Sequence, residues 1–224
     1  MTFSLVARAA DARLFGVAIA SSSPAVAARC AHGRAGVGAV ATQNITDPRL
    51  GPHILDDMGR GASAGVALDA ALSATPFGAY RQVLAIGEAG LPVVHSGANA
   101  LGIVNAAIGA NAAAAGNLLA SAAVPAAMIA AFERGGGHFG DCLLRALRAG
   151  LDAGGEAGPV HSAGLLIVRD VSWPIVDLRV DWTEEDPVAA LDSVWRLYAP
   201  QIDDYVRRAL DPSRAPSFGV PGDS

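Results

Sequence analysis

The stretch that decides the fold is the first one, Met1-Thr2-Phe3-Ser4-Leu5-Val6, which opens a nearly continuous apolar run up to Arg8. A small residue at position 2 normally allows removal of the initiator methionine in the cytoplasm. Thr2 would then carry a hydroxyl nucleophile and a free α-amine, a base whose ordinary pKa is ~7.7–8.0. The alternative is a frayed terminus without chemistry. The choice depends on whether the rest of the chain surrounds Thr2.

Two apolar runs, residues 2–8 and 14–20, are separated by a short polar turn and predict a hairpin. Because neither run has a polar face, the predicted sheet is covered on both sides. A third strand is predicted over residues 33–41, where glycines indicate a bulge or the close approach of other backbone. Further strands are predicted over residues 81–87, 91–96, 160–170 and 175–182.

The remaining segments show the apolar spacing or the capping residues of helices. Residues 54–74 predict two short helices, and Ser121 is the expected N-cap of a helix that runs to Arg134. Residues 97–116 are rich in alanine, asparagine and glycine and predict a loop with one strand. Two further helices are predicted over residues 140–151 and 186–208.

This order of elements predicts the fold class. Hairpins rather than βαβ crossovers join the strands, which argues against a parallel doubly wound sheet. We expect an α+β protein, a four-layer αββα sandwich of two antiparallel sheets between helix layers. Residues 1–210 are expected to form a single domain, and the proline- and glycine-rich residues 211–224 predict a disordered tail. In such a sandwich the first strand can be central, which would hold Thr2 at a sheet edge or in a cleft.

Composition excludes several classes of function. The formal charge of −5 argues against a nucleic-acid partner, which would require a basic stripe. All 16 basic residues are arginine, so lysine Schiff-base chemistry is excluded. The two cysteines and five histidines show no metal-binding spacing, and we expect neither a metal nor another cofactor. No apolar stretch of about 18 residues lacks polar breaks, so we expect a cytoplasmic protein without a membrane partner.

Polar side chains with amide groups follow two of the apolar segments. Thr42, Gln43 and Asn44 come together after the third predicted strand, and Asn117 follows the alanine-rich segment. Such groups are suitable hydrogen-bond donors for an oxyanion. They are equally typical of loop groups that are satisfied by their own neighbours. The adjacent His161-Ser162 indicates another kind of hydrolase, although no G-x-S-x-G motif is present to expose a nucleophile.

Eight segments of the chain lie at a spacing typical of a known family. They are Thr2–Ala7, Gly16–Ser21, Arg34–Gln43, Gly51-Pro52, Arg81-Gln82, Gly116-Asn117, Val176–Asp181 and Asp186-Pro187, and the third is the most specific. Together they resemble the bacterial family called domain of unknown function 1028, a group similar to N-terminal-nucleophile (Ntn) hydrolases. The resemblance covers residues 2–200, and the chain departs from the family pattern over residues 96–116 and 156–162.

The resemblance implies an αββα sandwich and the hydrolysis of an amide bond by an N-terminal threonine. Arg34 lies 32 residues after Thr2, the distance at which proteasome-like Ntn hydrolases place a cationic lysine. A cation there lowers the pKa of the amine and stabilises developing negative charge. Ser21 and Ser22 lie where such enzymes often have an acidic residue. A serine hydroxyl would therefore hold the amine, because no carboxylate is available at that position.

The predicted function is that of an Ntn-type amidohydrolase that cleaves a small linear or cyclic amide. Thr2 is the nucleophile and its own α-amine the base, and Gln82 and His161 join the residues expected to bind the substrate. One alternative is a catalytically inactive protein that keeps the fold and binds a metabolite or serves as an assembly subunit. Another is a hydrolase that uses His161 or Ser162. A homo-oligomer, a dimer or higher, is expected from the alanine-rich sandwich and its amphipathic terminal helix.

Overall fold

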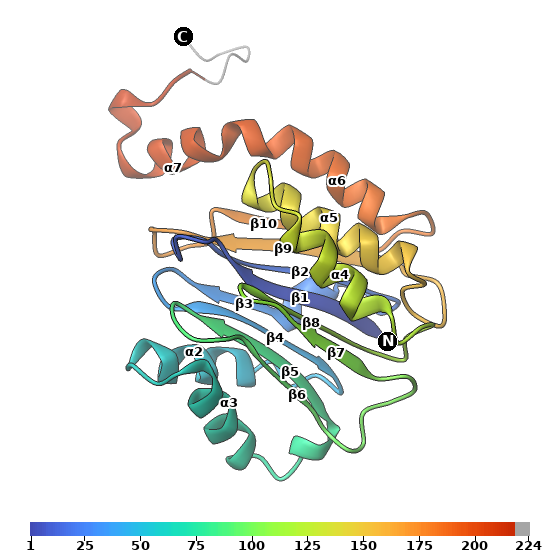
Figure 1. The fold of residues 1–224 in the computed structure, drawn as a ribbon. Coiled ribbons are helices and arrows are strands. Elements are labelled where there is room, and N and C mark those ends of the chain that lie inside the picture. Colours follow the sequence, from blue (N-terminus) through green and yellow to red (C-terminus); the bar gives the residue numbers. More distant parts are fainter. Residues whose placement is uncertain (218–224) are drawn as a thin grey trace.

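The computed structural model describes residues 1–217 and contains two antiparallel sheets that lie face to face (Figure 1). The larger sheet has six strands in the order β10-β9-β2-β1-β8-β7. The first strand is therefore central, as the sandwich prediction allowed, and pairs with β2 on one side and β8 on the other. The six strands are β1 (Thr2–Arg8), β2 (Phe15–Ser21), β7 (Asn105–Ile108), β8 (Ala112–Asn117), β9 (Ser162–Val168) and β10 (Val176–Val180).

The second sheet has four strands in the order β3-β4-β5-β6. Its first two strands replace the single strand predicted over residues 33–41. The chain turns at Gly36, whose φ is +67°, and the two halves pair as a hairpin. Glycine adopts this left-handed conformation without a Cβ clash, so it marks a turn here rather than a bulge. The four strands are β3 (Ala31–Arg34), β4 (Gly38–Asn44), β5 (Arg81–Gly87) and β6 (Val93–Ser96).

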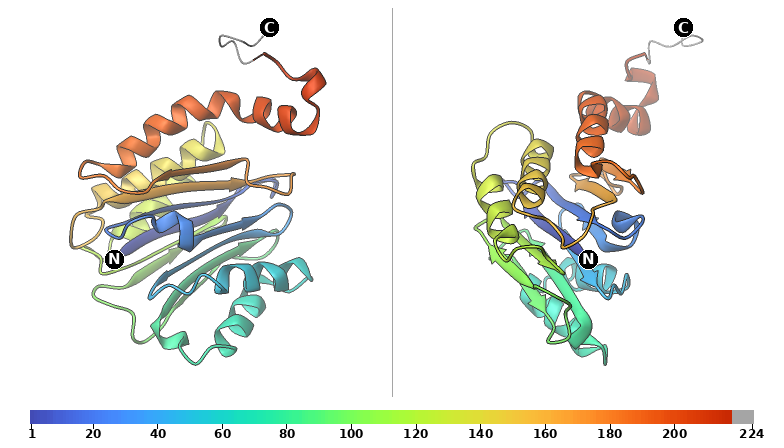
Figure 2. Two further views of the ribbon diagram at one scale, coloured as in Figure 1. Left: turned by 180° about the vertical axis from the view of Figure 1, so that it is seen from behind. Right: turned by 90° about the vertical axis from the view of Figure 1, so that its right-hand side faces the viewer.

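Helices cover the outer faces of both sheets, which confirms the predicted α+β class and the four-layer αββα sandwich (Figure 1, Figure 2). The helices α4, α5 and α6 pack on the six-stranded sheet, whereas α2 and α3 pack on the four-stranded sheet. The short α1 contacts β2, β4 and β9, and α7 follows α6. The helices are α1 (Val26–Cys30), α2 (Leu50–Gly59), α3 (Ala64–Ser73), α4 (Val124–Glu133), α5 (Phe139–Asp152), α6 (Pro187–Tyr198) and α7 (Ile202–Leu210).

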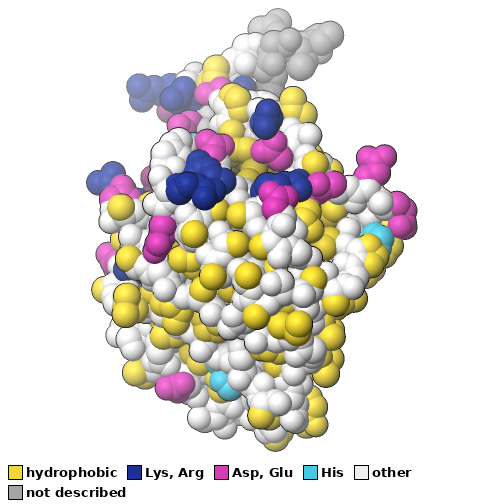
Figure 3. Space-filling view, turned by 45° about the vertical axis from the view of Figure 1, so that its right-hand side comes forward, with side chains coloured by type: hydrophobic (Ala, Val, Ile, Leu, Met, Phe, Trp, Pro, Cys, Tyr) yellow, Lys and Arg dark blue, Asp and Glu magenta, His cyan; other side chains and the backbone are white. Residues whose placement is uncertain are grey.

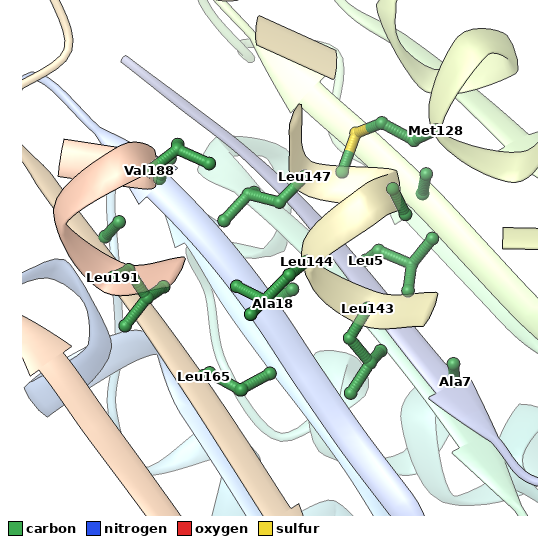
Figure 4. Packing of buried hydrophobic residues seen from close by; sticks show 14 of the residues in the cluster. Leu5, Ala7, Ala18, Met128, Leu143, Leu144, Leu147, Leu165, Val188 and Leu191 are labelled. Atoms are coloured by element: carbon green, nitrogen blue, oxygen red, sulfur yellow. The ribbon is translucent and has the colours of Figure 1, made fainter. Parts of the chain in front are cut away.

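The outer face of β1 anchors the helix layer above it. Successive side chains of a strand point to opposite faces, and Leu5 and Ala7 point toward α5. There they pack with Leu143 and Leu147, which lie on one face of that helix as the spacing of its leucines predicted (Figure 4). Each fully buried leucine contributes about 1.5–3 kcal/mol. This layer therefore holds α5 firmly on the sheet that carries Thr2.

The layer between the two sheets mixes alanines with larger apolar side chains. Val6, on the inner face of β1, belongs to a buried cluster with Ala39 and Ala41 of β4 and with Ala113 and Ala115 of β8. Alanine methyl groups allow the two sheets to pack closely, and protein interiors leave few voids between such groups. Near the start of β1 this apolar layer ends and polar side chains take its place.

Two predictions in the middle of the chain need correction. Residues 97–116 contain two strands, β7 and β8, which pair with each other, rather than one strand in a loop. The helix α4 begins at Val124 with Ala123 as its N-cap, so Ser121 is not the cap. The Ser121 hydroxyl instead accepts the N–H of Ala123 at 3.1 Å, a local turn that ends before the helix begins.

The predicted terminal helix, residues 186–208, is interrupted. It begins as expected after Asp186, whose carboxylate caps α6, but the 3₁₀ turn Ala199–Gln201 separates α6 from α7. That turn contains a proline, which cannot donate a backbone hydrogen bond inside a helix. Within the predicted tail, Pro212–Arg214 forms a further 3₁₀ turn, and residues 218–224 lie outside the described residues. No helix among residues 1–217 is long and apolar enough to span a membrane.

Candidate active site

Buried polar side chains gather at the end of the sandwich where β1 begins. Thr2 and Ser4 alternate with their neighbours in the same way as Val6, so they too face between the sheets. Only 7% of Thr2 and 0% of Ser4 is exposed. In the right-hand view of Figure 2 the start of the chain lies near the middle of this end. The other members of the polar cluster are Ser21 of β2, Gln43 of β4, Gln82 of β5 and Asn117 of β8.

Thr2 lies against Ser21 of the neighbouring strand. The distance between Thr2 Oγ1 and Ser21 Oγ is 3.2 Å. Both hydroxyls also donate hydrogen bonds to the carbonyl oxygen of Met1. Two hydroxyl donors therefore converge on the carbonyl group that precedes Thr2. Such convergence is the arrangement that polarises a carbonyl and stabilises an oxyanion.

The amide side chains form a network that connects the two sheets. Ser4 Oγ donates to Gln43 Oε1 at 2.7 Å, and Gln43 Nε2 donates to Gln82 Oε1 at 2.7 Å. Asn117 Nδ2 donates to the same Gln82 oxygen at 3.1 Å. Gln82 Nε2 donates to the carbonyl of Gly116 at 3.1 Å and to a serine hydroxyl of β6 at 2.9 Å. The structure thus brings together three of the amide residues that the sequence predicted for substrate binding.

The three amides differ in what they can still bind. Gln43 Nε2 donates to the Ala115 carbonyl as well as to Gln82, so both of its hydrogens are used, and those of Gln82 are used in the same way. Asn117 Oδ1 is buried and has no hydrogen-bond partner within residues 1–217. Asn117 is also the residue paired with Thr2 across the sheet. Of the three, Asn117 is the amide with acceptor capacity left beside Thr2.

Thr42 and Asn44 do not reach Thr2. They alternate with Gln43 on β4 and therefore face away from the layer between the sheets. Thr42 Oγ1 donates to the Asp47 carbonyl at 3.5 Å, and Asn44 Nδ2 donates to the Tyr80 carbonyl at 2.7 Å. Their placement corrects the prediction that all three consecutive polar residues belong to one donor set.

Arg34 lies at the opposite end of the sandwich. It pairs with Gly38 and forms a surface ion pair with Asp56 at 2.6 Å. Gly38 pairs in turn with Gly87 of β5, whose carbonyl accepts a hydrogen bond from Arg8, the last residue of β1. The whole length of β1 therefore separates Arg34 from Thr2, and the structure does not bring the predicted cation to the site. The distance along the chain fits, but the turn between β3 and β4 carries Arg34 away.

His161 and Ser162 flank the end of β2 without contacting each other as base and nucleophile. The backbone N–H of His161 donates to the Ser21 carbonyl at 3.0 Å, and the ring atom Nδ1 of His161 lies 2.8 Å from the Thr183 carbonyl. The His161 ring stacks on Trp182, with 4.2 Å between the ring centroids. Ser162 Oγ donates to a backbone carbonyl at 2.6 Å. Both residues are thus held by other partners, and His161 borders the polar cluster.

Glu156 supplies a carboxylate near Thr2, although no sequence signal indicated it. Its backbone is brought to the site by an isolated β-bridge to Leu119, just after β8. The side chain is buried, and both carboxylate oxygens accept the backbone N–H of Ser22, at 3.1 and 3.0 Å. Burial raises the pKa of Glu156 to about 7, opposed by the N-terminal ammonium, by Ser22 and by His161. Glu156 therefore lies beside the start of β1, and Ser22 contributes its N–H there.

A separate groove lies elsewhere, on the outer helix layer. It is a groove of about 910 Å³ between α5 and α6. Charged side chains gather over these helices (Figure 3). They pair with one another, as Arg148 does with Asp186 and Arg196 with Asp192, each at 2.8 Å. The groove therefore does not extend the polar cluster. Among residues 1–217 no three His, Cys, Asp or Glu side chains are placed to hold a metal ion.

Comparison with known proteins places the chain in a family. The chain is similar to a solved crystal structure, that of protein SPO2555 from Silicibacter pomeroyi, described as a DUF1028 protein. The match covers 92% of this chain and 90% of that chain, with 27% sequence identity and a TM-score of 0.85. Anbu (ancestral beta-subunit) from Yersinia bercovieri matches over 97% of its chain and 91% of this one, at 12% identity and a TM-score of 0.41, which establishes no common fold. No curated protein matches. The model for the family of unknown function DUF1028 matches residues 2–191, and this chain belongs to that family.

Proposed function

We propose that this protein is an Ntn-type amidohydrolase of the cytoplasm that acts on a small linear or cyclic amide, with Thr2 as its nucleophile once Met1 is removed. The observation that carries the proposal is the placement of the Thr2 hydroxyl. It is buried at the polar end of the inter-sheet layer, 3.2 Å from Ser21 Oγ, with both hydroxyls directed at one carbonyl. A frayed terminus would be neither buried nor bonded in this way.

The reaction needs no group beyond those of the site and water. Thr2 Oγ1 attacks the carbonyl carbon of the amide, and its proton passes to the α-amine of Thr2. The C–N bond breaks, the leaving amine takes that proton, and the acyl group remains on Thr2 as an ester. Water then attacks the ester, giving one proton to the α-amine, which returns it to Oγ1 as the acid leaves. The donors beside Thr2 for the oxyanion are the Ser21 hydroxyl and the second N–H of Asn117 Nδ2, whose first N–H bonds to Gln82.

The first test is the intact mass of the purified protein, which shows whether Met1 is removed. Thr2→Ala is then expected to lower the hydrolysis of a panel of small amides by at least about 10³-fold and to abolish labelling by an electrophilic lactone. Thr2→Ser is the matched control, because it keeps both hydroxyl and α-amine and should keep activity. Retention of Met1, or a Thr2→Ala variant that hydrolyses amides like the wild type, overturns the proposal.

The second candidate is a catalytically inactive protein that keeps the fold and binds a metabolite or serves as an assembly subunit. It is favoured by the amide network, in which Gln43 donates its hydrogens to Gln82 and to a backbone carbonyl, and Gln82 donates its own to Ser96 and to a backbone carbonyl. Under this candidate a metabolite raises the melting temperature of both wild type and Thr2→Ala, while no amide is hydrolysed. Hydrolysis that depends on Thr2 excludes it.

We also propose that the protein is a homo-oligomer, a dimer or higher. Several large apolar side chains are exposed in the single chain, and contact between copies would remove them from water. Light scattering coupled to size exclusion measures the mass, and a monomer at micromolar concentration would contradict it. The exposed side chains include Leu91, Ile103, Ile108 and Leu197.

A further inference from the structure

Met1 is held in the candidate site in the way that an aminoacyl group would be held. Its carbonyl oxygen accepts hydrogen bonds from the hydroxyls of Thr2 and Ser21. Its side chain lies directly on Gly158, where an added Cβ would come within 3.0 Å of Met1 Cε. Its α-amine acts electrostatically on Glu156. The carbonyl, the side chain and the amine of one amino acid therefore each have a separate partner.

Glu156 has hydrogen-bonding capacity that these contacts leave unused. An ionised carboxylate offers about four acceptor sites, whereas the hydrogen bonds that the described residues give to its two oxygens come from Ser22, through its backbone N–H and its side chain. Only 4% of Glu156 is exposed, so water cannot easily complete its shell. The α-amine of Met1 and the imidazole of His161 lie close enough to act electrostatically on it. Because a buried carboxylate is costly without a cation, an ammonium group is the ligand that suits this position.

We propose that the site takes α-aminoacyl amides, that is amino-acid amides and peptides with a free amino end. Glu156 binds the α-ammonium group of the substrate, and the substrate side chain lies over Gly158. The cleaved carbonyl takes the place of the Met1 carbonyl, against the hydroxyls of Thr2 and Ser21. The inference rests on the proposed function, because that function supplies the cleavage of the amide bond. The binding of the ammonium group can be measured without catalysis.

Binding is measured on Thr2→Ala, with Met1 removal verified by mass, so that no ligand is consumed. The probes are L-methioninamide and N-acetyl-L-methioninamide, compared by isothermal titration calorimetry. The free amine is expected to bind at least about 10-fold tighter, as one charged hydrogen bond provides. In Thr2→Ala/Glu156→Gln the two ligands are expected to bind equally. Equal affinities in Thr2→Ala, a preference that survives Glu156→Gln, or no binding of either ligand overturns the inference.

Glu184→Gln is the matched control for the change in charge. The Glu184 carboxylate lies 3.7 Å from His161 Nδ1, and 78% of its side chain is exposed. The Glu184→Gln substitution removes one negative charge from the same end of the protein and leaves the buried carboxylate of Glu156 in place. Glu184→Gln is therefore expected to keep the preference for the free amine. If it abolishes the preference as Glu156→Gln does, general attraction between charges explains the binding and the assignment to Glu156 is wrong.

Gly158 gives an independent test of the side-chain position. Gly158→Val fills the space that Met1 occupies, so L-methioninamide should bind at least about 10-fold more weakly while glycinamide changes less than about 2-fold. Gly158→Ala gives a smaller loss in the same direction and serves if the valine variant does not fold. Equal losses for both ligands, or none, contradict the placement.

The inference and the proposed function fail on different results. Hydrolysis of N-acetylated amides as fast as free ones, abolished by Thr2→Ala, would keep the proposed function and overturn the choice of substrate. Binding of L-methioninamide through Glu156 with no hydrolysis by the wild type would keep the binding site and overturn the enzyme.

Discussion

The two ends of the inter-sheet layer are built differently, although the same strand, β1, runs through both. At the far end Arg8 reaches across to the carbonyl of Gly87 on β5 at 2.9 Å, and its Nε donates to Asn111 Oδ1 at 2.9 Å. At the near end Thr2 and Ser4 supply uncharged hydroxyls instead. One end is closed by a cation that bonds to both sheets, and the other is filled with neutral groups beside a buried acid.

The difference shows where hydrogen-bonding capacity is used and where it is left over. The guanidinium of Arg8 bonds to partners on both sheets, which stabilises the far end. At the near end Asn117 Oδ1 lacks a partner among residues 1–217, and the hydrogen bonds to the two oxygens of Glu156 come from one residue, Ser22. Unsatisfied buried groups cost stability and need an explanation such as a ligand. The far end is therefore closed by the protein's own groups, whereas the near end keeps hydrogen-bonding capacity that the proposed site would use.

The largest expected effect comes from breaking the amide network at the near end. Gln82→Leu removes the acceptor of both Gln43 Nε2 and Asn117 Nδ2 and leaves two buried donors unsatisfied. Each such donor costs about 1–3 kcal/mol, so a loss of about 4 kcal/mol is expected in urea unfolding. Thr42→Val, on the other face of β4, is the control and should cost less than about 1 kcal/mol. Similar losses for both variants would show that the network is not special.

The next effect is a change in the pH dependence of stability. The raised pKa of Glu156, about 7, means that the folded protein binds this proton more tightly than the unfolded chain does. The resulting stability is full below the unfolded value of about 4.5 and is lost as the pH rises through 7. Glu156→Gln mimics the protonated form, so it should match the wild type at about pH 4 and exceed it by about 3 kcal/mol at pH 8. Parallel curves for wild type and variant would refute the assignment.

A smaller effect is expected at the far end. Arg8→Met keeps the aliphatic stem of the side chain and removes its hydrogen bonds to Gly87 and Asn111. A loss of about 2 kcal/mol in the free energy of unfolding is expected, with kcat/KM for the amide substrate unchanged. This result would sharpen the division between the ends. A fall in kcat/KM as large as the fall in stability would show that the two ends are coupled.

The smallest effect is expected for Arg34. Its ion pair with Asp56 is nearly half exposed, and such pairs contribute about 0.5 kcal/mol. Arg34→Ala should therefore barely change the unfolding midpoint and should leave kcat/KM unchanged. If Arg34 were the cation that serves Thr2, kcat/KM would fall by orders of magnitude instead, and the placement at the far end would be contradicted.

Much of the fold could be predicted because apolar runs and turns are local signals. The hairpin of β1 and β2 and the strand β5 follow directly from such runs. The prediction of a single third strand was wrong because the turn at Gly36 separates two short strands whose residues read as one continuous segment in the sequence. The prediction of one long terminal helix was wrong because the amphipathic pattern continues through the 3₁₀ turn at Ala199–Gln201.

The candidate site could be predicted only where a residue lies on a strand. Gln43 and Asn117 end strands and face inward, and the parity of Ala39 and Ala41 would also have shown that Thr42 faces away. Glu156 had no such signal, because a long-range bridge in a loop between α5 and β9 places it. Spacing along the chain, which suggested Arg34, contains no information about the direction of a turn.

The alanines of the inter-sheet layer have a consequence for the precision of the site. Alanine has no side-chain rotamer to select, so Ala39, Ala41, Ala113 and Ala115 lose almost no side-chain conformational entropy on folding. These four positions therefore have no rotamer to change, although larger side chains such as Phe15 and Leu84 share the same layer. At the alanines the spacing between the sheets is set by the backbones, which helps to keep the hydroxyls of one sheet aligned with the amides of the other.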